Sequence, residues 1–303
     1  MPGPGGIGRV RATGPDSTKL SVGDWVFCDP TIRSRDDAIR PDMMLLGWTA
    51  VGAAALPLHR CFHNGTFTEQ VLLPTENVTP IGEIEVADAG RWCVLSSLLV
   101  PYGGLLAGDL QPGETLVVNG ATGGFGSAGI VVALAMGAGK VVATGRNERA
   151  LEDLVRRFGP RVRRARMTGD EEDDRRLIGK VAGGPIDLVL DLLPREASSS
   201  QVLAAVFAVR PGGRVVLMGG VGRQGGNDLA LPYPLAHAKR HYSTRQMDVP
   251  ACCCVSNGAA GPRGAHRPGP VRCNRILAER CERCCHLRRC QCRSASPHRT
   301  SPG

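Results

Sequence analysis

The segment Gly120–Gly126 contains the residues whose types and spacing best indicate chemistry. It reads Gly-Ala-Thr-Gly-Gly-Phe-Gly, with glycine at every third position. Glycine suits a loop where a pyrophosphate lies against backbone amides and the positive end of a following helix, because a Cβ would collide with the ligand. This spacing predicts a dinucleotide site, and the alternative is a tight turn that binds nothing. The predicted loop residues are Gly120, Thr122, Gly123, Gly124, Phe125 and Gly126.

The residues about 20 positions beyond this loop distinguish the two nicotinamide cofactors. A site for NAD usually places Asp or Glu there, whereas this chain reads Gly145-Arg146-Asn147. A guanidinium group can pair with a phosphate through two hydrogen bonds. The sequence thus favours NADP(H), held by Arg146 and Asn147, and the alternative is that Arg146 is simply an exposed residue at a helix start. Asp191 and Gly219, which belong to later strand segments, complete the predicted cofactor site.

Alternating strands and helices are expected to position these residues. Leu151, Leu154, Val155 and Phe158 fall at i, i+3, i+4 and i+7 on one helical face, and Asn147 is placed to cap that helix. Strands are predicted at about 115–119, 140–144, 186–193 and 214–218, with a weaker one at 163–168, and helices lie between them. The alternation predicts an α/β fold with a doubly wound parallel sheet.

The first 90 residues have a different pattern. Short β-like runs such as 21–27 and 65–73 are separated by turns, and no helix of clear period lies between them. We therefore expect a small β-rich unit before the α/β domain.

Six motifs, in their order along the chain, resemble the medium-chain dehydrogenase/reductase family, which includes alcohol dehydrogenases and zinc-free quinone reductases. They are Val22-Gly-Asp-Trp-Val, Gly65-Thr-Phe-Thr-Glu, Pro101-Tyr-Gly-Gly-Leu-Leu, Gln111-Pro-Gly-Glu-Thr, Gly120–Gly126 and Pro211-Gly-Gly-Arg-Val-Val-Leu-Met-Gly. The resemblance covers about Pro2 to Pro234. It implies a partial, chaperonin-10-like substrate domain (1–95), a dinucleotide-binding Rossmann domain (96–234), and a tail (235–303) outside the family pattern. It also implies that about half of the substrate domain should precede Pro2.

The resemblance further implies hydride transfer between NADP(H) and a small carbonyl, alcohol or quinone. Zinc-dependent members carry Gly-His-Glu where this chain reads Gly3-Pro4-Gly5, and proline cannot ligate a metal. No cysteine lies between Asp29 and Trp48, where the family's structural-zinc lobe would be. We therefore expect the zinc-independent branch, with no metal. No catalytic residue is assigned, because core or loop roles suit Ser96 and Tyr102 as well as catalytic ones.

The tail after Pro234 has a composition of its own. It holds 13 of the 37 Lys and Arg but 3 of the 28 Asp and Glu, and nine of the 12 cysteines. Its cysteines and His286 can be read as a metal knuckle, but a shifted reading frame explains the composition better, and such a segment is expected to be disordered. Loss of a sixth strand would leave 214–218 as an exposed edge, which puts a homodimer in doubt.

Composition narrows the function classes. The residues before Leu235 are almost neutral, and the basic tail has a single aromatic residue, Tyr242, so a nucleic-acid partner is not expected. The start of the chain lacks a signal-peptide pattern, and its apolar stretches are interrupted by Pro, Gly and Lys, which predicts a cytoplasmic protein without a membrane partner. The expected partner is a small-molecule substrate. The alternative function is a non-catalytic remnant that binds nucleotide or associates with other chains.

Overall fold

The computed structural model describes residues 1–36, 39–50, 52–221, 228–231 and 242–244. The chain divides into two compact units, Met1–Val249 and Pro250–Gly303, and every described residue lies in the first. Apart from the short strand at 242–244, the predictions for the tail (235–303) therefore fall outside the described residues. Among the described helices, none has both the length and the apolar character needed to cross a membrane.

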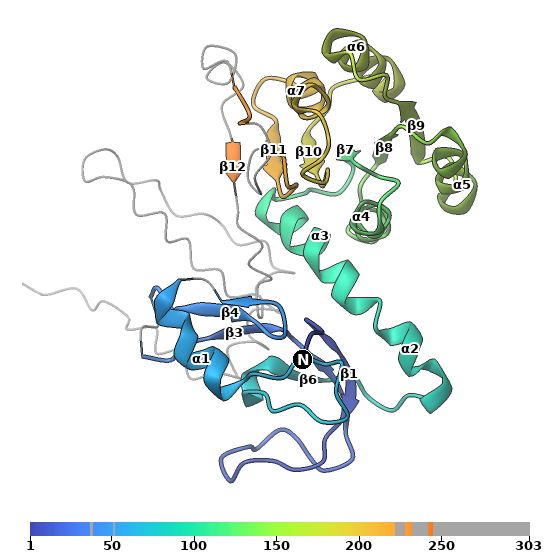
Figure 1. The fold of residues 1–303 in the computed structure, drawn as a ribbon. Coiled ribbons are helices and arrows are strands. Elements are labelled where there is room, and N and C mark those ends of the chain that lie inside the picture. The colour runs from blue at the N-terminus through green and yellow to red at the C-terminus, as the bar shows by residue number, and fades with distance from the viewer. Residues whose placement is uncertain (37–38, 51, 222–227, 232–241, 245–303) are drawn as a thin grey trace, which may run out of the picture. The chain divides into compact units, whose positions relative to one another are not determined.

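A six-stranded parallel sheet forms the centre of the α/β part, in the order β12-β11-β10-β7-β8-β9 (Figure 1). Its strands are β7 (Thr115–Asn119), β8 (Lys140–Gly145), β9 (Val162–Arg166), β10 (Leu188–Asp191), β11 (Arg214–Leu217) and β12 (Tyr242–Thr244). Strands β8 and β9 lie on one side of β7, whereas β10, β11 and β12 lie on its other side. In sheets of this kind, ligands bind outside the carboxyl ends of the strands at the place where the strand order reverses, which here is between β7 and β10. The predicted doubly wound fold is confirmed, including the weakly indicated strand β9.

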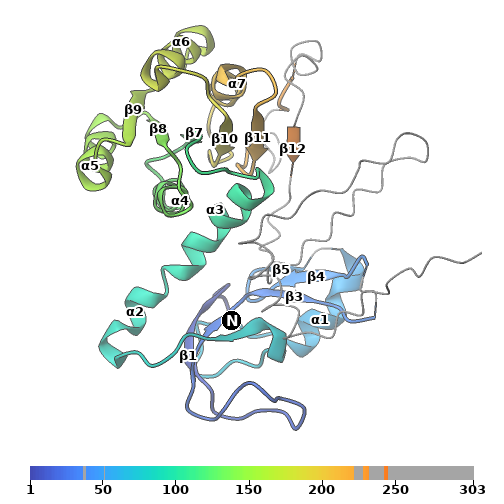
Figure 2. The same ribbon diagram turned by 180° about the vertical axis from the view of Figure 1, so that it is seen from behind.

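Helices cover both faces of this sheet, as Figures 1 and 2 show. Alternate residues of β7 point to opposite faces, so that Leu116 and Val118 join one apolar core and Val117 joins the other. The first core includes residues of α3 (Leu95–Ala107), α4 (Gly124–Ala135) and α5 (Glu148–Phe158), and the second includes residues of α6 (Glu171–Ala182) and α7 (Ser199–Ala208). Burial on both faces explains why these strands are continuous apolar runs.

Side-chain caps fix where two of these helices begin. The side chain of Asn147 accepts a hydrogen bond from Ala150 N at 3.1 Å, as the sequence predicted for α5. Asp170 caps α6 in the same way, accepting from Asp173 N at 2.9 Å. Each cap satisfies a backbone N–H that has no partner within its helix.

The β-rich part contains two three-stranded antiparallel sheets, β1-β2-β6 and β3-β4-β5. A small apolar cluster of Ile32, Met44 and Leu46 stabilises the second sheet. The strands are β1 (Gly6–Arg9), β2 (Trp25–Cys28), β3 (Thr31–Arg33), β4 (Met43–Leu45), β5 (Thr49–Ala50) and β6 (Val78–Pro80), and the α-helices are α1 (Leu56–Cys61) and α2 (Ala89–Trp92).

Two expectations about the elements are wrong. Helix α1 was not predicted, because it has six residues and buries none of them, so it produces no apolar period. Strand β11 was expected to be an exposed edge, but β12 pairs with it in parallel, with Val215 opposite Tyr242 and Leu217 opposite Thr244. The segment after Pro234 thus supplies the sixth strand, and the reason for doubting a homodimer no longer holds.

The turn between β9 and α6 depends on one buried carboxylate. Asp174 is fully buried and accepts hydrogen bonds from Thr168 N at 2.7 Å, Thr168 Oγ1 at 2.9 Å and Gly169 N at 2.9 Å. Removing the carboxylate would leave these donors without a partner inside the protein.

We therefore predict that Asp174→Ala lowers the free energy of unfolding by about 2 to 3 kcal/mol, because a lost charge-assisted acceptor leaves buried donors unsatisfied. The exposed cap variant Asp170→Ala serves as the control and should lose about 1 kcal/mol. Urea unfolding followed by circular dichroism measures both. Equal losses in the two variants would contradict the prediction.

Candidate cofactor and substrate sites

The glycine loop joins β7 to α4 in a conformation that two of its glycines make possible. Gly120 has a φ of 83°, which residues with a Cβ rarely adopt. A Cβ on Gly126 would overlap the carbonyl oxygen of Gly120 and lie 2.7 Å from the Cα of Ala121. Gly123 is the N-cap residue of α4 and has no side chain to occupy its first turn. The amides at this helix start therefore remain accessible to an anionic ligand.

A cavity of about 340 Å³ lies at this loop, at the carboxyl ends of β7, β8 and β10. Seven of the ten residues predicted to bind the cofactor line it: Gly120, Thr122, Gly123, Gly124, Phe125, Gly126 and Arg146. Arg146 is the one charged residue among those lining this cavity, and its side chain is exposed. A cradle of backbone amides with one cation and no acid fits a dinucleotide that carries a 2′-phosphate.

The other three predicted residues do not line the cavity. The side chain of Asn147 is used as the cap of α5. Asp191 is 2% exposed and lies beneath the cavity. Gly219 packs on Asp191, because a Cβ there would overlap Asp191 Oδ2 and lie 2.6 Å from the carbonyl oxygen of Leu193. All three are next to the site without forming its surface.

Sequence reasoning missed a second set of residues that line the same cavity. They follow or end the neighbouring strands, or begin α7: Asn119, Thr144, Gly145, Met167, Leu192, Leu193, Pro194, Ala197 and Gln201. Their place directly after the predicted strands could have identified most of them, because the carboxyl ends of parallel strands meet at one edge of the sheet.

A row of polar side chains crosses three strands under the cavity. Asn119 Nδ2 donates to Asp191 Oδ1 at 2.8 Å and to the carbonyl oxygen of Gln201 at 3.2 Å, while Asn119 Oδ1 accepts from Thr144 Oγ1 at 2.6 Å. Burial raises the pKa of Asp191 to about 7, although hydrogen bonds from Asn119 and from the backbone of Leu193 act in the opposite direction. The carboxyl group therefore changes its charge close to neutral pH.

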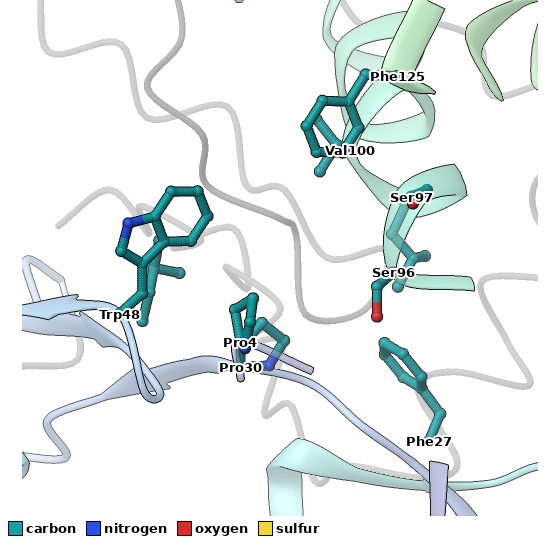
Figure 3. A pocket seen from close by; sticks show the side chains of 10 residues that line it. Pro4, Phe27, Pro30, Trp48, Ser96, Ser97, Val100 and Phe125 are labelled. Carbon is teal, nitrogen blue, oxygen red and sulfur yellow. The ribbon is translucent and has the colours of Figure 1, made fainter. Parts of the chain in front are cut away.

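A second cavity, of about 210 Å³, is almost entirely apolar (Figure 3). It is lined by Pro4, Phe27, Pro30, Leu45, Trp48, Ser96, Ser97, Leu99, Val100 and Phe125. Figure 3 shows Ser96 and Phe27 near one another, with Trp48 on the opposite side and Phe125 beside Val100. Phe125 lines both cavities, so the glycine loop contributes a wall to each.

The described residues do not fit a zinc ion. No group of three or more His, Cys, Asp or Glu side chains in this part of the chain is placed to hold a metal. Pro4 lines the apolar cavity where the family's zinc-dependent members have a histidine in sequence. Cys28 is buried, and burial raises the pKa of its thiol to about 11, so that it stays protonated and is a poor ligand.

Comparison with known proteins agrees with the α/β fold described above. Residues 124–247 match the family described as zinc-binding dehydrogenase. Alcohol dehydrogenase TADH from Thermus sp. ATN1 superposes with a TM-score of 0.62 at 24% identity, over 81% of this chain and 68% of that one. Galactitol-1-phosphate dehydrogenase from Escherichia coli superposes with a TM-score of 0.60 at 17% identity, over 80% of this chain and 66% of that one.

An alcohol dehydrogenase superfamily protein from Novosphingobium aromaticivorans gives a TM-score of 0.53 at 26% identity, over 78% of this chain and 59% of that one. A comparison with curated proteins finds no match. The order of strands, the glycine loop and the matched segment agree with one another. Residues 124–247 are therefore similar to the zinc-binding dehydrogenase family, and the fold of the chain is that of the alcohol dehydrogenases.

Proposed function

We propose that this chain is an NADP(H)-dependent, zinc-independent oxidoreductase that transfers hydride to or from a small carbonyl, alcohol or quinone. The observation that carries this proposal is the position of Phe125, which lines both the cavity at the glycine loop and the apolar cavity. A cofactor in the first cavity and a substrate in the second would share this wall. Hydride transfer requires such adjacency, because reacting atoms must come within about 3 to 3.5 Å.

The cofactor would supply the hydride, and the chain would supply binding and orientation. Gly120, Gly123 and Gly126 keep the loop free of side chains, and the start of α4 presents amides to the pyrophosphate. Arg146 follows β8 directly and supports a preference for the 2′-phosphate of NADP(H).

The apolar cavity favours a small and largely uncharged substrate. None of the residues that line it carries a charge, and its hydroxyl groups are those of Ser96 and Ser97. Apolar walls such as Trp48 and Phe27 exclude water from the reacting groups, which strengthens the remaining polar interactions. A serine hydroxyl can donate one hydrogen bond to a substrate oxygen, and this would orient a carbonyl group without a metal.

One prediction of the proposed function concerns cofactor choice. Arg146→Ala should weaken NADPH binding by about 1.5 to 3 kcal/mol, because a charged hydrogen bond to the phosphate is lost, and should leave NADH binding nearly unchanged. Isothermal titration calorimetry with both cofactors measures this. Arg149→Ala, which removes another exposed arginine three positions along, is the matched control and should keep the preference. Equal affinity of the wild-type chain for NADPH and NADH would contradict the NADP(H) assignment.

Another prediction of the proposed function concerns zinc. NADPH oxidation with small apolar carbonyls and quinones should be unaffected by a chelator, because the described residues offer no set of three ligands. Atomic absorption of the purified chain should find no stoichiometric zinc. Activity that disappears with chelator and returns with added zinc would refute zinc independence. Tight NADPH binding without turnover of any such substrate would instead favour the non-catalytic alternative.

A further inference from the structure

Asp191 is a buried ionisable group that the proposed hydride transfer does not use. It ends β10 and is 2% exposed, and its register partner Asn119 ends β7 and is 1% exposed. Asn119 connects it to Thr144 on β8 through hydrogen bonds of 2.8 and 2.6 Å. Three neighbouring strands thus present one continuous polar row at the edge of the sheet where the larger cavity lies.

Three segments enclose the carboxyl group, and two of them also line the cavity. Asn119 precedes the glycine loop and donates to Asp191 Oδ1. Leu193, which lines the cavity, donates its backbone N–H to the carboxyl group. Gly219 lies against Asp191 Oδ2, with Gly220 N donating to the carbonyl oxygen of Leu193 at 2.8 Å. Asn119 and Leu193 therefore contact Asp191 and also line the cavity.

No cation neutralises this carboxyl group within the described part of the chain. The groups around it are uncharged: Asn119 from β7 donates to it, Thr144 from β8 and the backbone carbonyl of Gln201 from α7 are bonded to Asn119, and Gly219 lies against it after β11. Arg195 and Glu196 follow in the same loop, but both are exposed and pair with each other at 2.7 Å. Arg146 is the one cation that lines the cavity, and no charged group pairs with Asp191 itself, so that a net negative charge placed in the cavity acts on Asp191.

We propose that Asp191 takes up a proton when the dinucleotide binds, so that the buried carboxyl group becomes neutral beneath an anionic cofactor. This inference rests on the proposed cofactor site. Neutral and ionised Asp191 both accept from Asn119 and Leu193, but a carboxylate is repelled by the pyrophosphate and 2′-phosphate whereas the neutral acid is not. Binding and protonation are therefore linked, and each favours the other.

The direction of the pH effect follows from this linkage. The pKa of Asp191 is about 7 in the free chain and is higher in the complex. The NADPH affinity gained from neutral Asp191 is then fully present below the pKa that Asp191 has in the free chain. It is lost as the pH rises through the pKa that Asp191 has in the complex. A rise of one unit corresponds to about a tenfold difference in affinity between the low-pH and high-pH limits.

Calorimetry in buffers of different ionisation enthalpy measures the proton directly. NADPH binding to the full chain at pH 7.5 should take up about half a proton for a one-unit rise, with uptake falling toward zero above about pH 9. Asp191→Asn keeps the shape and an acceptor oxygen but cannot titrate. It should abolish this uptake and hold NADPH affinity at its low-pH level across the range.

Two controls separate this effect from others. Asp187→Asn removes a carboxylate that precedes β10 at the opposite edge of the sheet and pairs with Arg210 at 2.7 Å, so it should leave proton uptake unchanged. The 2′-phosphate of NADPH itself titrates near pH 6 and does so equally in Asp191→Asn, which subtracts its contribution. If Asp191→Asn does not fold, the wild-type measurement with NADH decides, because NADH carries the pyrophosphate but lacks the titrating 2′-phosphate and should still cause proton uptake near pH 7.5.

The outcomes distinguish this inference from the function on which it rests. NADPH binding with no proton uptake by the wild-type chain, or uptake that persists in Asp191→Asn, overturns the role of Asp191 and leaves the cofactor site intact. Absence of NADPH binding at every pH overturns the cofactor site and this inference together.

Discussion

The close approach of Gly126 to the backbone of Gly120 is the constraint on which the rest of the site depends. A side chain on Gly126 would separate the start of α4 from the end of β7. With glycine there, the helix begins directly at the edge of the sheet, and its free amides face the cavity. The same approach allows Ala121 N to donate to the carbonyl oxygen of Thr144 at 2.9 Å, which ties the loop to β8.

The strands of the parallel sheet have apolar residues in their middle and polar residues at their carboxyl ends. The apolar residues stabilise the fold, and the polar residues lie at the candidate site. In β7, Leu116, Val117 and Val118 are fully buried between the two helical layers, and the next residue is the polar Asn119. Buried polar groups are tolerated when their hydrogen bonds are made, and the side-chain amide of Asn119 makes three. The apolar residues hold the sheet together, while the polar residues give its carboxyl edge a defined arrangement.

The sequence predicted the parts of the structure in which local pattern and tertiary environment agree. The apolar face of α5 and its cap at Asn147 were both visible, because the helix has one buried side and a polar start. Helix α1 was not visible, because it lies on the surface without a buried residue. Strand β12 was not expected, because its three residues are too few to show a period, and its pairing with β11 is a tertiary contact.

The candidate site was predicted to a similar extent and for similar reasons. The glycine loop and Arg146 were found because backbone geometry and charge constrain residue type directly. Residues such as Met167, Leu192 and Gln201 line the same cavity because of their position at strand ends or on α7. Such a position does not require a particular amino acid, so the sequence does not reveal it. Asp191 was predicted to bind the cofactor, whereas the structure places it next to the cavity and not on its surface. Its burial could not be predicted, because an acid at a strand end has the same apolar neighbours in sequence whether it is exposed or buried.

Within the proposed function, the lining of the apolar cavity narrows the kind of carbonyl compound that suits the site. A metal ion stabilises the negative charge that develops on a substrate oxygen by several kcal/mol. The described residues offer no metal site, and the hydroxyl groups of the cavity are those of Ser96 and Ser97, each a weaker stabiliser than a metal. A substrate that spreads the developing charge over its own conjugated system needs less help from the protein. Among carbonyls, alcohols and quinones, conjugated carbonyls and quinones therefore fit this cavity better than simple alcohols, and their flat apolar rings match its aromatic walls at Phe27, Trp48 and Phe125.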